Sequence, residues 1–237
     1  MLSKNELEKI LETALEEGGD FADIFIEKKI TTGIGCEDNK IDRVNTGIDM
    51  GAGVRVISGD TTSYAYTNDL SLHGLLQIAN VASRAAKSGR STKPIRINKR
   101  MPEFDFAIEL SPDAVPVSDK VGQVERANKA ARGVDERIKQ VSVGYGDTIQ
   151  DVVIANSEGV YVEDRRIRTR FVVNAVASDA GQVQTGYEAF GGTEGYEIFK
   201  THSAEELGET ASRRAIALLQ ADPAPAGKMP VVMAAEA

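Results

Sequence analysis

The order of amphipathic patterns along the chain is the feature that most constrains its fold. Ser3 followed by Glu6 has the spacing of a capping box, and apolar residues then recur at helical period until Gly18. Strand-like runs joined by turn residues follow at 20–36, 41–44, 51–57 and 61–66. A second helix, capped by Asn68 or Asp69, is predicted to end near Gly89. The first unit therefore contains a helix, several strands and a helix.

The same order of elements recurs in the second half of the chain. A helix is predicted over 117–133, and Ser203, with Glu206 three residues later, caps a last helix. Between these helices lie strand-like runs at 138–145, 150–156, 159–163 and 169–178. Because the strands come in consecutive runs joined by tight turns, we expect an α+β fold of two similar helix–strands–helix subdomains with mostly antiparallel sheets.

Proline and glycine mark the expected domain boundaries. We expect a first α/β subdomain over 1–90, a proline-containing connector over 91–116 and a second α/β subdomain over 117–222. The connector is expected to run extended over the surface. Residues 223–237 are interpreted as a linker and an apolar strand that begin a truncated carboxy-terminal domain, with a terminal strand of the existing sheet as the alternative.

Charge and cysteine content limit the classes of partner. The net charge of −8 would repel a phosphate backbone, and the basic stretch 93–100 has no aromatic residues for stacking on bases, so no direct nucleic-acid contact is expected. A single cysteine, no leader pattern and no apolar run near about 18 residues favour a cytoplasmic protein without a membrane contact.

The residue types that carry catalysis are sparse. His73 and His202 lie far apart without partners at ligand spacing, so neither a metal site nor a catalytic site is expected from them. Cys36 has acidic neighbours that would oppose a reactive thiolate, and no G-x-S-x-G elbow is present. The acidic pair at 163–164, followed by two arginines, is interpreted as a solvated edge of mixed charge.

Several stretches together resemble one protein family. They are Asp20-Phe21-Ala22-Asp23, Gly51-Ala52-Gly53-Val54-Arg55-Val56-Ile57-Ser58-Gly59, Tyr64-Ala65-Tyr66-Thr67, Gly195-Tyr196-Glu197 and the segment from Ala224 to Val232. In this order, over essentially the whole chain, they resemble the TldD/PmbA family, once named for modulation of DNA gyrase. The last segment is closer to the TldD branch than to its PmbA (TldE) paralogue.

The resemblance implies a zinc metallopeptidase that acts on unfolded or modified peptides beside a PmbA-like partner. In that family an H-E-x-x-x-H helix binds the zinc, and its glutamate is the general base. This chain has no His-Glu pair, so no catalytic or metal residue is carried over, and zinc is expected only in a longer parent protein. The chain then corresponds to an amino-terminal domain that handles substrate and partner, inactive alone.

Peptide binding is the remaining role, and an extended peptide could add to a sheet edge by backbone hydrogen bonds. The candidate residues are Arg55, at a glycine-lined strand, and Gly191 with Gly192, in a predicted loop. The expected partners are a peptide substrate and either a PmbA/TldE-like paralogue or a second copy of the chain. The alternatives are a stand-alone, non-catalytic peptide-binding or scaffold protein and, with least support, a DNA-associated modulator.

Overall fold

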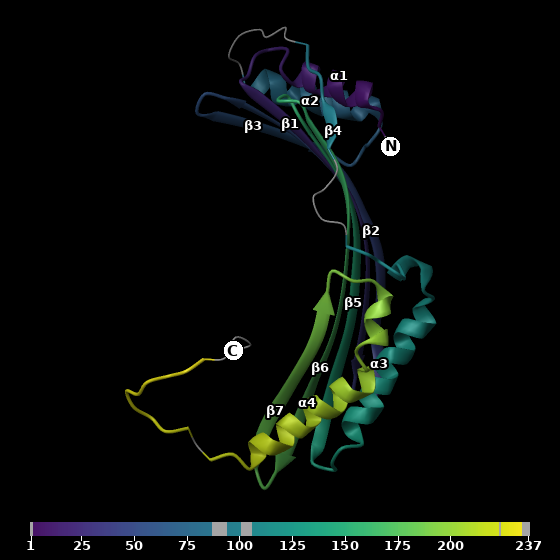
Figure 1. Cartoon of the computed structure of the whole chain (residues 1–237), viewed down its shortest axis with the longest axis vertical. Helices are drawn as coiled ribbons and strands as arrows, with labels where there is room; N and C mark the ends of the chain where they lie inside the picture. Colours follow the sequence, from purple (N-terminus) through teal and green to yellow (C-terminus); the bar gives the residue numbers. More distant parts are fainter. Residues whose placement is uncertain (1, 87–93, 101–105, 223, 234–237) are drawn as a thin grey trace.

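The computed structural model describes residues 2–86, 94–100, 106–222 and 224–233, and shows one long, bowed sheet (Figure 1). Within these residues, seven strands form the order β3-β2-β1-β5-β6-β4, and β7 also pairs with β6. The strands are β1 (Phe21–Glu37), β2 (Lys40–Ser58), β3 (Thr61–Thr67), β4 (Asn98–Arg100), β5 (Ile138–Asn156), β6 (Val160–Asp179) and β7 (Gln182–Gly192). All pairings are antiparallel except that of β4 with β6, which confirms the predicted α+β class.

Four helices accompany the sheet in the described part of the chain. They are α1 (Lys4–Ala14), α2 (Leu72–Ala86), α3 (Val117–Arg132) and α4 (Ala204–Leu219), with short 3-10 helices η1 (Pro112–Ala114) and η2 (Tyr196–Lys200). Figure 1 shows α1 and α2 at one end of the sheet, and α3 and α4 at the other. Among the described helices, none has the length and apolar character that crossing a membrane requires.

The caps agree with the sequence prediction at two helices and differ at a third. Ser3 and Glu6 form the reciprocal capping box of α1, and Ser203 caps α4. The cap of α2 is Ser71, whose Oγ accepts the N–H of Gly74 (3.1 Å), and not Asn68 or Asp69. Asp69 instead accepts the N–H of Ser71 (2.9 Å), so it orders the turn that leads into the helix.

Three strands are longer than predicted. The runs 41–44 and 51–57 are parts of the single strand β2, and β5 and β6 likewise each unite two predicted runs. In β2 the apolar pattern is interrupted because, among the described residues, no helix covers the middle of this strand. Residues such as Ile48, 60% exposed, therefore face solvent, and the alternation of apolar and polar residues fades.

All four helices lie on one face of the sheet. Ile24 and Ile34 both have even numbers in the uninterrupted strand β1, so their side chains leave the same face. Ile24 belongs to the core under α1 and α2, whereas Ile34 belongs to the core under α3 and α4. The sheet therefore supports two separate cores on its convex side, and its concave side has no helical cover in the described residues (Figure 1).

Residues 94–100 of the predicted connector take part in the first core. Ile95 and Ile97 are buried, and the Ile97 N–H donates to Glu8 Oε1 (3.1 Å). Residues 91–93 and 101–105 of the connector lie outside the described residues. The strand expected at the end of the chain is not formed within 224–233, where Val231 and Val232 are 74% and 99% exposed.

A buried ion pair lies where α3 crosses the sheet. Lys120 Nζ donates to Asp147 Oδ2 (2.6 Å), and the Tyr145 hydroxyl donates to the same oxygen (2.6 Å). The two charged side chains are only 3% and 2% exposed. Burial, together with the neighbouring carboxylate, raises the pKa of Tyr145, which keeps its hydroxyl protonated as a donor.

Removal of one member of this pair should strongly destabilise the fold. The Lys120→Met variant leaves the Asp147 carboxylate buried without a cation, so we expect a loss of about 3 kcal/mol in the free energy of unfolding. Urea unfolding measures this loss. The matched control is Arg213→Met, which removes a cation from an exposed pair with Glu209 and should cost less than about 0.5 kcal/mol. Equal effects in the two variants would contradict a structural role for the pair.

Helix α4 contacts the backbone of β7 at Gly186. A Cβ atom at Gly186 would lie 2.0 Å from the Ala211 carbonyl oxygen. The Gly186→Ala variant should therefore displace α4 and lower the free energy of unfolding by about 2 kcal/mol. Gly33→Ala is the control, since nothing lies within 4 Å of its Cβ position, and it should change stability by less than about 0.5 kcal/mol. Thermal unfolding of both variants compares the two sites.

Candidate functional site

The concave face of the sheet is the candidate site because it lies open and exposes backbone. Odd-numbered residues of β1 and even-numbered residues of β5 point to this face, opposite the two cores. Its floor contains several glycines: Gly33, Gly47, Gly51, Gly53, Gly144 and Gly146. A ligand can approach the strands closely where side chains are absent.

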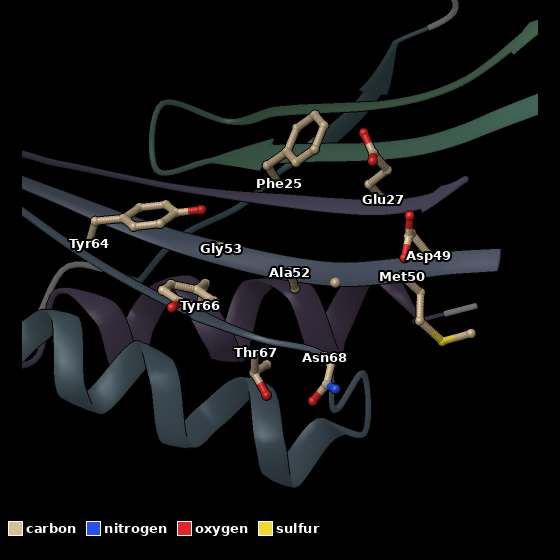
Figure 2. Close-up of a pocket in the computed structure, with 11 residues that line it drawn as sticks. Phe25, Glu27, Asp49, Met50, Ala52, Gly53, Tyr64, Tyr66, Thr67 and Asn68 are labelled. Carbon is tan, nitrogen blue, oxygen red and sulfur yellow. The ribbon is translucent and has the colours of Figure 1, made fainter. Parts of the chain in front are cut away.

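One hollow of about 740 Å³ lies at the end of this face near β3. Figure 2 shows Phe25, Glu27 and Asp49 pointing to the same side of the sheet, with the Tyr64 ring over β2 near Gly53. A Cβ atom at Gly53 would lie 2.1 Å from the Tyr64 hydroxyl, so glycine makes room for this ring. The hollow therefore combines aromatic surface with two carboxylates.

Arg55 lies beside this hollow and does not line it. On β2 it stands opposite Asp23 of β1, and its Nε donates to Asp23 Oδ2 (3.2 Å). This hydrogen bond and the carboxylate charge raise the pKa of the guanidinium. Because Arg55 is already paired and its side chain is 46% exposed, its position is that of a surface ion pair. Its role in peptide binding stays a prediction.

Two further hollows adjoin each other near the middle of the concave face. One of about 450 Å³ is lined by Gly191, Gly192 and residues 168–170, and one of about 380 Å³ includes Thr31, Gly146 and Thr148 with the same residues of β6. Gly191 and Gly192 form the end of β7, paired with Arg170 and Thr169, and do not lie in a loop. The structure thus places the two glycines at a hollow and Arg55 apart from them, beside a different one.

A row of arginines lies on β6, and two of them, Arg168 and Arg170, line these hollows and give them a positive charge, whereas Arg166 is paired with Asp164 (2.5 Å). Arg166, Arg168 and Arg170 are exposed and alternate with the buried Ile167 and Thr169. Arg170 Nη2 donates to the Tyr187 hydroxyl (2.9 Å), whereas Arg168 has no hydrogen-bond or ion-pair partner within the described part of the chain. Guanidinium groups in such a row suit carboxylates, which they bind through paired hydrogen bonds.

Sequence reasoning missed this row because it interpreted the charges as a solvated edge. The signal was the alternation of arginine with buried residues from Arg166 to Phe171. This period of two places all three guanidinium groups on one face of a strand. When arginines alternate with buried residues along a strand, the pattern predicts that the exposed face of that strand is positively charged.

The described residues do not fit a zinc ion. Between residues 2 and 233, leaving aside the undescribed positions, no group of three histidine, cysteine or acidic side chains converges as metal ligands do. His73 lies near Gln77 on α2, and His202 stacks on Phe190 with 4.8 Å between ring centroids. Each histidine is therefore placed by local contacts in a different part of the molecule.

Comparison with known proteins finds relatives of this chain. A family model described as PmbA/TldA metallopeptidase domain 1 matches residues 22–88, and the PmbA/TldA metallopeptidase central domain matches 110–219. A protein of Methanothermobacter thermautotrophicus named "Metalloprotease" is 31% identical over 92% of this chain and 47% of its own length. A Metalloprotease TldD homolog of Haemophilus influenzae is 27% identical over 99% of this chain and 50% of its own. The chain spans about half the length of these curated relatives.

Solved structures share the fold. A candidate modulator of DNA gyrase from Thermotoga maritima superposes with a TM-score of 0.71 at 19% identity, over 87% of this chain and 46% of that one. TldE from Thermococcus kodakarensis superposes with a TM-score of 0.68 at 14% identity, over 89% of this chain and 47% of that one. At such identities the likeness concerns the arrangement of strands and helices.

The Cys36 thiol should be unreactive in the folded protein. Cys36 is buried in the core under α3 and α4, and burial raises the pKa of its thiol, which lowers the thiolate fraction at neutral pH. We expect a thiol reagent such as DTNB to label it at least about a hundredfold more slowly in buffer than in denaturant. Rapid labelling of the folded chain would contradict this account and would make Cys36 a candidate nucleophile.

Proposed function

Because the chain belongs to the TldD/PmbA metallopeptidase family, we propose that it is the amino-terminal, substrate-handling part of a zinc-dependent peptidase for unfolded or modified peptides. Its relatives are named metalloproteases, and this chain corresponds to about half of their length. Within the proposed enzyme, zinc supplies activation of water, and the residues of this chain bind and orient the peptide. No step of hydrolysis is assigned to them.

The open concave face with its arginine row supports this function. The residues of an extended peptide have the same spacing along the chain as the residues of the strands beneath it. The glycines of the floor let the peptide backbone approach these strands. Arg168 and Arg170 would hold carboxylates of the peptide at the hollows beside Gly191 and Gly192. An unfolded substrate suits this geometry, because its backbone is free to adopt the extended form along the strands.

The outer edge of β7, which pairs with no strand in the described part of the chain, offers a second set of contacts. Gln182 follows the two-residue turn at Ala180-Gly181, so its backbone N–H and C=O groups bond to Asp179 of β6. The backbone groups of every second residue from Val183 to Gly191 therefore point away from β6, toward the outer edge. The outward carbonyl of Tyr187 already accepts a bond from Arg214 Nη1 (3.1 Å). The edge near Gly191 would therefore accept backbone hydrogen bonds from a peptide, beside the arginines.

A partner subunit belongs to the same proposal. The proposed partner is either a PmbA/TldE-like paralogue or a second copy of this chain. Such a partner would bind a surface outside the concave face, which receives the peptide. Direct DNA contact has less support, because the net charge of −8 opposes binding to a phosphate backbone.

Peptide affinity tests the role of the arginine row. Two short unstructured peptides that differ only in glutamate or glutamine would be labelled and titrated with protein in fluorescence anisotropy. The double variant Arg168→Gln, Arg170→Gln should weaken binding of the glutamate peptide roughly tenfold and change the glutamine peptide much less.

Arg213→Gln is the control for that titration, since it removes one exposed cation from α4, far from the concave hollows in the fold. It should leave both affinities unchanged. If the double variant binds the glutamate peptide as tightly as the control does, the arginine row does not receive the peptide.

A further inference from the structure

Among the residues that the structure describes, the middle of β2 is a sheet edge without a partner strand. β3 covers β2 only from Ala52 to Ser58, and the other side of β2 is occupied by β1. All residues from Asp42 to Met50 are exposed, and Val44, Ile48 and Met50 keep 46%, 60% and 46% of their surface accessible. A long exposed edge that carries apolar side chains is a template for pairing with another strand.

The turns at both ends of β2 determine which backbone groups face this edge. Residues that flank a two-residue turn bond to each other, as Ser58 does with Thr61 and Lys40 does with Glu37. Counting from Ser58, even-numbered residues face away from β1. Counting from Lys40 through the bulge opposite Gly35 and Cys36 gives the same result. Val44, Thr46, Ile48 and Met50 therefore direct their N–H and C=O groups to the free edge.

We infer that this edge pairs with the same edge of a second copy, antiparallel and centred on Thr46. This register brings Arg43 opposite Asp49 of the second copy and Val44 opposite Ile48 of the second copy, each of them twice by symmetry. It also brings outward-directed residues opposite one another, as hydrogen bonding requires. The segment Arg43-Val44-Asn45-Thr46-Gly47-Ile48-Asp49 is thus complementary to its own reverse.

The faces of the sheet agree with this register. Val44 stands opposite the buried Ile34, so the valine and isoleucine pairs lie on the convex side, whereas Arg43 and Asp49 lie on the concave side. Neither Arg43 nor Asp49 has an ion-pair partner among the residues described. A shift centred on Asn45 would place Asp42 opposite Ile48 of the second copy, and a shift centred on Gly47 would leave Arg43 without a carboxylate opposite it.

Charge complementarity identifies the occupant as a second copy, since an unrelated strand has no reason to carry an acid and a base at this spacing. The inference deepens the partner-binding part of the proposed function. Association is measured without peptide, so that a failure here and a failure of peptide binding are distinguishable. Because the contact is a single strand pair, we expect a weak dimer that dissociates on dilution.

Charge reversal tests the pairing. Sedimentation velocity over roughly 1 to 200 µM, a range suited to a small interface, would compare the wild type, Arg43→Asp, Asp49→Arg and an equimolar mixture of the two variants. The first variant carries acids at both ends of the edge and the second carries bases at both ends. Each should associate at least about tenfold more weakly than the wild type, and the mixture should recover dimers.

Arg213→Asp, an exposed charge reversal on α4, is the control and should associate as the wild type does. Circular dichroism and thermal unfolding verify that each variant is folded. A wild type that stays monomeric throughout, single variants that dimerise as well as the wild type, or a mixture that remains monomeric would each overturn the inference.

Discussion

One-sided coverage of a shared sheet is the constraint on which the rest of the structure depends. The two helix pairs bury their apolar stripes on the convex face, and both cores use the same long strands β1, β5 and β6. Side chains of the opposite face belong to neither core. That face is therefore free to carry small, aromatic and charged residues, which are the ones that line its hollows.

Local signals in the sequence predicted the four helices of the described residues, two of the three caps considered and the turns that end β1, β2 and β5, whereas β4, β7 and the turn at Ala180-Gly181 were not predicted. Asp38 and Asn39, for example, both have positive φ in a two-residue turn, as their residue types indicated. Strand continuity was not predictable, because the signal for a strand is the contrast between a buried and an exposed face. In the middle of β2 both faces are exposed, and residues such as Asp49 and Met50 gave no such contrast.

The residues singled out from the sequence lie on or beside the candidate site, and their role in peptide binding stays a prediction. Gly191 and Gly192 line a hollow, but their strand position and the neighbouring arginines of β6 depend on pairing between β6 and β7, which sequence spacing alone does not determine. Arg55 was singled out for its charge, and the structure pairs that charge with Asp23 across the strands. Strand register therefore decides whether the charge of a surface arginine is neutralised, as that of Arg55 is, or has no partner among the described residues, as with Arg168.

The first core contains residues that are synthesised late, and this affects when it can form during translation. The core under α1 and α2 includes Ala155 and Tyr161, which come from β5 and β6, far along the chain from Ile24. A nascent chain that has emerged only as far as α2 lacks these side chains and the central partner of β1. The first core thus closes late in translation, and its apolar residues stay exposed until β6 arrives, a period in which chaperones have access to them.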